Sequence, residues 1–311
     1  MTNEKNAGWF DDLPVLAEMT PEQTAAKLEE VGETETAEQI RHAPATGALE
    51  TFEAPTHPSW LSRPWKHASH TFGFIEPAAP GAGMLPLRYA GDIDPDTTLK
   101  GKRIKITLDS LRVAGYPGFG VHNILFDFYA KNQVPKAVEH LHFNATYRAS
   151  DGENVGVIGY PIFIGLNVSG EGVDFKCETV NVKNDSDEKF LKMLDSDTFK
   201  AGLKLATTAQ PAIAPLSGLA MGITRTIASR NKNVPVQNFY MGLDFSNTPT
   251  RARLRAGSYV AVQIPASFEV AWDWNQWVFQ PSSGQLVSAS DKKQMIPYNY
   301  LVFGVSRYDG D

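Results

Sequence analysis

Runs of alternating apolar and polar residues between positions 122 and 182 constrain the fold of this chain more than any other feature. In the first run, Ile124, Phe126 and Phe128 share one face of an extended strand, because successive strand side chains point to opposite sides. A second run, at residues 139–149, alternates in the same way. Both runs predict half-buried strands of an antiparallel sheet, with one face on a core and the other in solvent.

A tight turn and two further runs extend this sheet. Asp151 and Gly152 follow the second run, and this pair tolerates the positive φ angles that hairpin turns need. Residues 155–168 are almost continuously apolar, which is typical of a strand buried on both faces or bent at its proline and glycine. Residues 172–182 alternate again. The whole stretch therefore predicts successive antiparallel strands joined by short turns.

Strand patterns also occur outside this stretch, and about nine or ten are present in all. The additional runs lie at residues 102–113, 236–245, 257–264, 268–279, 284–288 and 298–308. Strands and helices do not alternate in the order of a parallel sheet, so an antiparallel β-sandwich is favoured. At the level of fold alone, the layout loosely resembles C2-like sandwiches, and no sequence motif supports that resemblance.

Helical patterns lie before and within the predicted sandwich. Residues 1–43 contain a capped helix start and are predicted to form a small N-terminal helical segment. Residues 44–91 are rich in proline and glycine but also in aromatic residues, so we expect an extended arm lying on the sandwich. Residues 92–311 are predicted to be the sandwich domain, and residues 186–231 within it have the periodicity of an inserted α-helical hairpin.

Composition narrows the classes of function. The chain of 311 residues has a net charge of −6, which argues against nucleic-acid binding through a basic surface. Its one cysteine, Cys177, rules out an intramolecular disulfide and is expected to be an inert core thiol. A polar N-terminus without a secretory signal pattern, and no apolar run of about 20 residues, predict a cytoplasmic protein.

Two histidines are the first candidate metal ligands. His140 and His142 are two residues apart on a predicted strand, so both project from one face, as in metal sites of barrel-like β folds. His122 lies on a neighbouring strand and could approach them. The cupin pattern would place a glutamate a few residues after the pair, and residues 143–151 contain none. The sequence favours two exposed strand histidines and leaves a transition-metal site as the alternative.

Three aspartates form the second candidate metal site. Asp92, Asp94 and Asp96 alternate as calcium ligands do in loops, but the segment fails the EF-hand pattern because Thr97 replaces the required glycine. Calcium could still bind if loops of the sandwich converge, with Asp151 or Asp185 as an additional ligand. A solvated turn before a strand is the favoured interpretation. No cofactor is expected otherwise.

The inserted helices carry the candidate interaction surface. Leu216, Leu219, Ile223 and Ile227 form an apolar stripe at helical spacing, and Gly218 and Gly222 form a small-residue pair on the same helix. Small residues allow close approach of another helix. The favoured interpretation is that the stripe covers the sandwich. The alternatives are an oligomerisation surface or, because basic residues surround the stripe, a membrane-contact surface.

Aromatic residues near the C-terminus have two interpretations. Trp272, Trp274 and Trp277 resemble a carbohydrate-stacking platform, but large core residues of a sandwich follow the same spacing, and the core is favoured.

The sequence contains no motif of nucleophilic or phosphate-binding chemistry, and nothing in it indicates an enzyme. We therefore expect a non-enzymatic interaction or structural module that assembles with partner proteins or with itself. The alternatives are a membrane-binding or membrane-acting effector that uses the helical insertion, and a metal-dependent enzyme that uses His140 and His142.

Overall fold

The computed structural model describes most of the chain after residue 67. The described residues are 68–79, 81–118, 120–183, 202–206, 208, 213–229, 233–246 and 252–310, with positions 22, 26, 38 and 41. Strands dominate this part, so the predicted mainly β class is confirmed. The predicted helical head lies outside the described residues except for those four positions, which are helical, and Arg41 Nε lies 3.1 Å from Glu22 Oε1.

One layer of the fold is a five-stranded sheet. Its order is β12 (Ala252–Arg253), β11 (Val234–Asp244), β9 (Gly172–Val182), β5 (Val121–Val134) and β6 (Ala137–Ser150). β12 pairs with β11 in parallel, and the other pairs are antiparallel. Ile124, Phe126 and Phe128 are buried on its inner face, as their period-2 spacing predicts.

The second layer is an eight-stranded sheet. Its order is β10 (Leu203–Lys204), β8 (Tyr160–Asn167), β4 (Arg103–Arg112), β16 (Tyr300–Tyr308), β13 (Gly257–Pro265), β1 (Ala68–Ile75) and β3 (Arg88–Tyr89), with β7 (Asn154–Val155) on β4. β1 pairs with β13 over its full length. Residues 68–91, which we assigned to an arm lying on the sandwich, therefore contribute strands to the sheets themselves.

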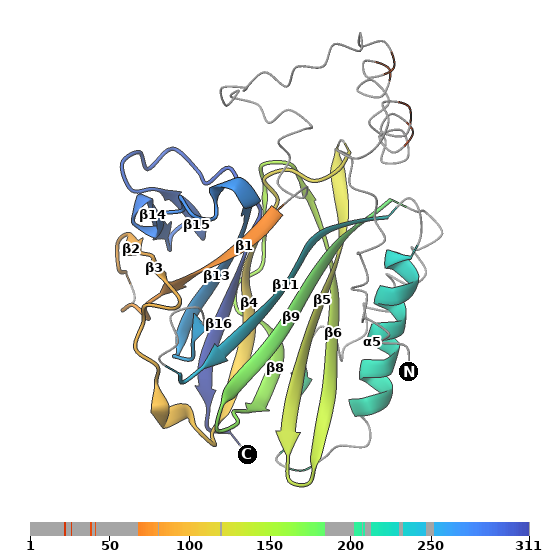
Figure 1. Ribbon diagram of the computed structural model, residues 1–311, viewed down its shortest axis with the longest axis vertical. Helices are drawn as coiled ribbons and strands as arrows, with labels where there is room; N and C mark the ends of the chain where they lie inside the picture. The colour runs from red at the N-terminus through yellow and green to blue at the C-terminus, as the bar shows by residue number, and fades with distance from the viewer. Residues whose placement is uncertain are drawn as a thin grey trace, which may run out of the picture.

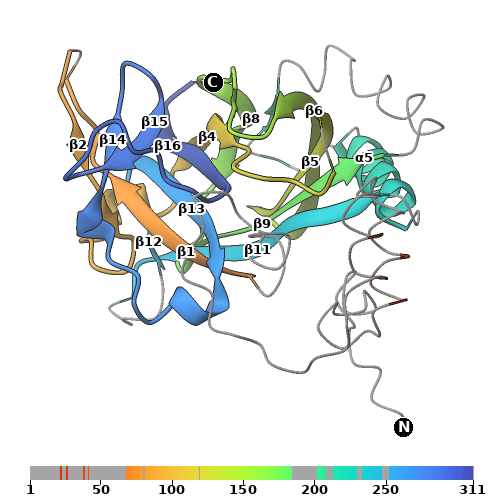
Figure 2. The ribbon, with the colours of Figure 1, turned by 90° about the horizontal axis from the view of Figure 1, so that it is seen from above.

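The two large sheets face each other and enclose the main hydrophobic core, which is a sandwich-like arrangement (Figures 1 and 2). Phe128 of β5 lies at the centre, and its ring centroid is 5.3 Å from that of Phe175 in the same sheet and 5.0 Å from that of Phe303 in the opposite sheet. Cys177 is buried in the same core, as predicted. A C2-like topology is not confirmed.

The outer side of the eight-stranded sheet carries a second core. A three-stranded sheet of β2 (Leu85–Pro86), β14 (Trp277–Gln280) and β15 (Gln285–Ser288) covers it. Trp274 fits there because Gly73 on β1 has no side chain, and a Cβ at that position would lie 2.6 Å from the indole ring. The eight-stranded sheet is thus buried on both faces, which explains the continuous apolar character of residues 259–262.

The prediction of one strand at residues 268–279 is wrong. It contains the end of a short 3-10 helix (Ala266–Phe268), a turn, a second 3-10 helix (Trp274–Gln276) and only then β14. Asp273 caps the second helix by accepting a hydrogen bond from Asn275 N at 2.9 Å. This local capping interrupts the strand that the alternating tryptophans indicated. Trp274 belongs to the second core, with Trp272 and Trp277 packed against it, so the core interpretation holds.

The predicted helical hairpin is not confirmed. Among the described residues of the insertion, α5 (Ile213–Ala228) is the one helix, and residues 186–200 lie outside the described part. Leu203, which we placed on a helix, is in β10, which pairs with β8 in parallel. Leu203 and Leu205 are buried and Lys204 is exposed, which is a strand alternation too short to recognise in the sequence. No described helix is long and apolar enough to cross a membrane.

Candidate functional site

Helix α5 packs on the outer face of the five-stranded sheet, and this packing brings the predicted interaction surface close to the predicted histidine pair. Figure 1 shows α5 running alongside β6, the last strand of that sheet. The backbone N–H of His142 donates a hydrogen bond to Ser217 Oγ at 3.2 Å, and Asn144 Nδ2 donates to Thr224 Oγ1 at 3.1 Å. The helix therefore covers an edge strand whose polar groups would otherwise face solvent or another chain.

The two predicted histidine ligands each have a nearby partner. His140 Nδ1 lies 2.7 Å from the hydroxyl of Tyr129, and His142 Nδ1 lies 3.3 Å from Asp127 Oδ1. His122 does not join them, because it pairs with Ala149 at the far end of the hairpin. Within the described part of the chain, no three histidine, cysteine or carboxylate side chains gather as metal ligands.

A charged cluster that we did not identify from the sequence lies beside His142. Asp127 on β5 and Glu178 on β9 are register partners, and both are buried. Burial raises the pKa of Glu178, although an ion pair with Lys176 opposes that shift. Lys176 Nζ also lies 5.4 Å from the ring centroid of Tyr240. The alternation on each strand reveals these outward polar residues, but only the pairing register makes them neighbours.

The cluster is closed rather than open to a substrate. Glu178 is 2% exposed and Asp127 is 3% exposed. Asn144 Nδ2 donates to Asp127 Oδ1 at 2.6 Å and links this carboxylate to the helix through Thr224. Buried charges need such partners because removal from water is costly. The arrangement therefore fixes the position of α5 on the sheet.

The predicted interaction residues divide between the two sides of α5. Ile223 and Ile227 are buried on the side of α5 that faces the sheet. Leu219 is 40% exposed, and Gly218 and Gly222 are exposed as well. No atom of the described residues would lie within 4 Å of a Cβ added at either glycine. The side chain of Leu216 is outside the described part. The apolar stripe is thus shared between the sheet and the outward side.

The aspartate loop does not gather its three carboxylates. Asp96 accepts a hydrogen bond from Thr98 N at 3.0 Å and caps a 3-10 helix (Thr97–Leu99). Asp92 and Asp94 are exposed. Asp151, one of the two additional ligands considered, takes part in a different cluster, and Asp185 lies outside the described residues. The loop therefore has the geometry of a capped turn before β4.

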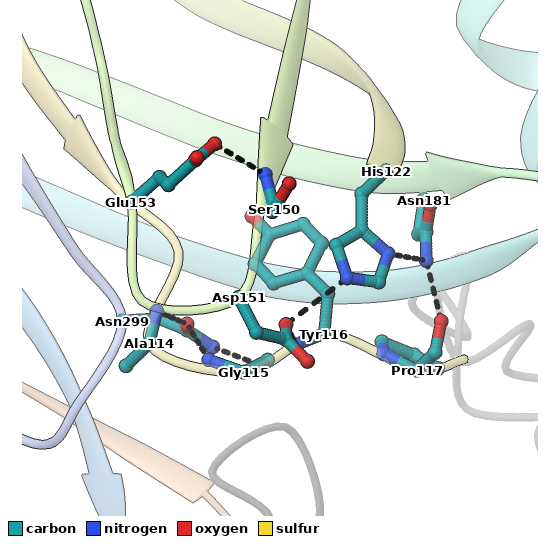
Figure 3. Close-up of polar contacts among 10 residues, drawn as sticks. All are labelled: Ala114, Gly115, Tyr116, Pro117, His122, Ser150, Asp151, Glu153, Asn181 and Asn299. Carbon is teal, nitrogen blue, oxygen red and sulfur yellow. Dashed lines mark hydrogen bonds and ion pairs between the residues drawn. The ribbon is translucent and has the colours of Figure 1, made fainter. Parts of the chain in front are cut away.

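Figure 3 shows that other cluster, around His122. Asn181 Nδ2 donates to the carbonyl of Pro117 at 2.7 Å and to His122 Nδ1 at 3.1 Å. His122 Nδ1 is then an acceptor, so Nε2 carries the hydrogen that is donated to Asp151 Oδ1 at 3.0 Å. Asp151 Oδ1 also accepts from Tyr116 N at 2.9 Å.

The His122 cluster anchors a loop. Asn299 Oδ1 accepts from Ala114 N at 2.8 Å, and its Nδ2 donates to Gly115 O at 3.1 Å (Figure 3). Residues 114–117 are thus held by Asn299, just before β16, by Asp151 in the turn after β6 and by Asn181 on β9. His122 is completely buried, so its imidazole is not exposed to a substrate. The sequence signal was Asp151-Gly152, which we interpreted as a turn, with Asp151 as a candidate calcium ligand.

A third polar group lies on β1. His70 packs against Phe239 with ring centroids 4.7 Å apart, and its Nε2 atom is buried without a hydrogen-bond partner among the described residues. Burial lowers the pKa of His70 from 6.5 to about 4, although a hydrogen bond with Gln237 opposes that shift. A neutral imidazole therefore occupies the interior at neutral pH.

Comparisons with protein-family models, curated protein sequences and solved structures gave no match. The functional argument for this chain therefore depends on its own residues.

Proposed function

We propose that this protein is a non-enzymatic, sandwich-like β module that assembles with a second copy of itself through the outward side of α5. This outward side comprises Gly218, Leu219 and Gly222. The observation that carries the proposal is the two-sided helix, whose inner side is bound to the sheet and whose outer side presents an exposed leucine between two glycines.

The inner side gives the helix a fixed position. Ser217 and Thr224 receive hydrogen bonds from β6, and Asn233 Nδ2 donates to the carbonyl of Ile227 at 2.8 Å near the helix end. A surface held in this way loses little conformational entropy on association. The closed polar cluster beneath it supports a positioning role for the sheet residues rather than a catalytic role.

The two glycines have no evident role inside the described chain. Each glycine in a helix interior costs about 0.5–1 kcal/mol relative to alanine. An alanine Cβ would meet no described atom at either position, so internal packing does not require glycine there. Close approach of another helix backbone would explain both residues, because small residues spaced by four form a flat surface. If two copies associate through α5, the glycines of each copy face the helix backbone of the other, so one symmetric contact explains the glycines of both copies.

The Gly222→Leu substitution tests the proposal. We expect the purified protein to be a dimer, and the variant to dissociate more readily while its melting temperature changes little, because the new side chain points away from the sheet. The measurements are sedimentation velocity over a concentration series and thermal unfolding at a concentration where both proteins are monomeric.

Two controls accompany this experiment. Gly156→Leu places the same side chain at another exposed glycine with no described atom within 4 Å, and it should leave the dimer intact. Gly222→Ala should stabilise α5 by about 1 kcal/mol through helix propensity. A monomeric wild-type protein would reject self-assembly. If that monomer binds liposomes and Gly222→Leu abolishes the binding, the membrane-contact alternative replaces it.

A further inference from the structure

A hollow of about 460 Å³ opens next to Tyr240, on the β11–β12 side of the five-stranded sheet. It is separate from α5, which packs mainly on β6 at the other side of that sheet. Its volume falls within the range of small-molecule sites. Residues of β1, β9 and β11 line part of it, among them Phe72, Val173, Met241 and Leu243.

Polar side chains also line the hollow. Lys131 and Gln133 come from β5, and Asp174 comes from β9. None of the three side chains makes a hydrogen bond or ion pair within the described part of the chain. By contrast, the nearby Asp244 accepts hydrogen bonds from Ser246 N and Oγ at 2.9 and 2.8 Å. The first three residues therefore offer donors and acceptors to a ligand without breaking internal contacts.

Gly242 explains how Asp174 reaches this position. The two residues are register partners on β9 and β11. A Cβ at Gly242 would lie 3.0 Å from Asp174 Oδ1, so the carboxylate lies across the neighbouring strand where the side chain is missing. Glycine is unfavourable inside a strand and often marks a close approach. Here it gives the carboxylate room beside Tyr240.

Tyr240 supplies an aromatic surface at the hollow. It is 70% exposed, although it lies within a strand of the sheet. The ammonium group of Lys176, itself paired with Glu178, lies above the ring and restrains it. A restrained, exposed ring is suited to stacking, since little side-chain entropy remains to be lost on binding.

The charges select the class of ligand. Among the described residues that line the hollow, three are carboxylates, Glu171, Asp174 and Asp244, and one, Lys131, is a cation, and this balance disfavours anions. Within the described residues no set of metal ligands is present. A neutral molecule with many hydroxyl groups and one apolar face satisfies the free donors, the free acceptors and the exposed ring together.

We propose that this hollow is a carbohydrate-binding site in which Tyr240 stacks on a sugar ring while Asp174, Lys131 and Gln133 bind hydroxyl groups. The site does not depend on assembly through α5.

The test uses maltotriose, cellotriose and chitotriose as probes. Isothermal titration calorimetry measures the binding of each one to the full chain. We expect at least one trisaccharide to bind with a millimolar or lower Kd. Tyr240→Ala should weaken that binding about tenfold, because the stacking ring is lost. Tyr240→Phe retains the ring and should bind within about twofold of the wild type. Asp174→Asn, which alters a hydroxyl acceptor, should weaken binding without changing the melting temperature.

Phe268→Ala is the matched control, since Phe268 is another exposed aromatic residue, at 51%, and does not line the hollow. It should leave the Kd unchanged. The proposal is overturned if none of the three trisaccharides binds at millimolar concentration, or if Tyr240→Ala and Phe268→Ala bind as tightly as the wild type. Either result leaves assembly through α5 unaffected.

Discussion

Asn144 on β6 and Thr224 on α5, both buried, are joined by a hydrogen bond of 3.1 Å. The same Asn144 amide donates to Asp127 Oδ1 at 2.6 Å. One side chain therefore links the helix to the charged cluster of the sheet. Thr224 Oγ1 also donates to the carbonyl of Ala220 at 3.2 Å, one helical turn earlier.

This link predicts that Thr224→Val lowers the free energy of unfolding by about 1 kcal/mol, because the Asn144 amide loses an acceptor in the interior. Urea unfolding measures the loss. Thr226→Val is the matched control, since Thr226 Oγ1 makes the same contact to the carbonyl four residues earlier, at 2.8 Å, but receives nothing from the sheet. Equal losses in the two variants would mean that the Asn144 contact contributes no stability.

The main core predicts a large effect at Phe126, which is completely buried and lies 5.9 Å from Phe128 and 6.2 Å from Tyr147 between ring centroids. Phe126→Ala should cost about 3–5 kcal/mol, because apolar burial is lost and a cavity remains. Denaturant unfolding checks this value. A loss below about 1 kcal/mol would mean that this face of β5 is not in the core.

His70 predicts a pH dependence of stability. The folded protein holds its imidazole neutral down to about pH 4, whereas the unfolded chain binds a proton near pH 6.5. The unfolded state therefore binds more protons between these values, and stability falls as the pH falls through this window. The slope from this residue approaches about 1.4 kcal/mol per pH unit.

The variant His70→Asn removes this titration. The loss of unfolding free energy between pH 7 and pH 5 should be smaller in the variant than in the wild type, as measured by urea unfolding at each pH. If both proteins lose the same amount, His70 is protonated in the folded state and the burial argument fails.

Asp151 predicts a local effect at the loop. Asp151→Ala removes the acceptor for both Tyr116 N and His122 Nε2, and an unsatisfied buried donor costs about 1–3 kcal/mol. Hydrogen exchange at the Tyr116 amide should accelerate by at least tenfold. The amide of Phe128, in the middle of β5, serves as the internal reference. An unchanged rate at Tyr116 would show that Asp151 does not hold the loop.

The strands of the central sheet could be predicted from the sequence because their alternation is local. Ile124, Phe126 and Phe128 are all on the predicted inner face. The run from Phe268 to Phe279 was wrongly predicted to be one strand, because side-chain caps such as Asp273 override an alternating pattern over a few residues. β1 was missed because its residues, His70 to Gly73, alternate weakly and pair with a strand almost 200 positions away.

The candidate sites depend on register, which the sequence does not reveal. His140 and His142 share one face, as their spacing predicts, but their partners Tyr129 and Asp127 become neighbours only through the pairing of β5 with β6. Tyr240 and Lys176 meet through the pairing of β9 with β11. The four-residue spacing of the outward glycines of α5 could be recognised in the sequence. Which side they occupy follows from the packing of Ile223 and Ile227.

Oxidative cross-linking of Leu219→Cys tests assembly through α5 most directly. The only native cysteine, Cys177, is buried, and burial raises the pKa of its thiol, so the new cysteine is the reactive one. Two copies packed through α5 should form a disulfide-linked dimer in high yield, whereas Val270→Cys, at a fully exposed loop position, should remain mostly monomeric. Equal yields from the two variants, or no covalent dimer from Leu219→Cys, would contradict assembly through this helix.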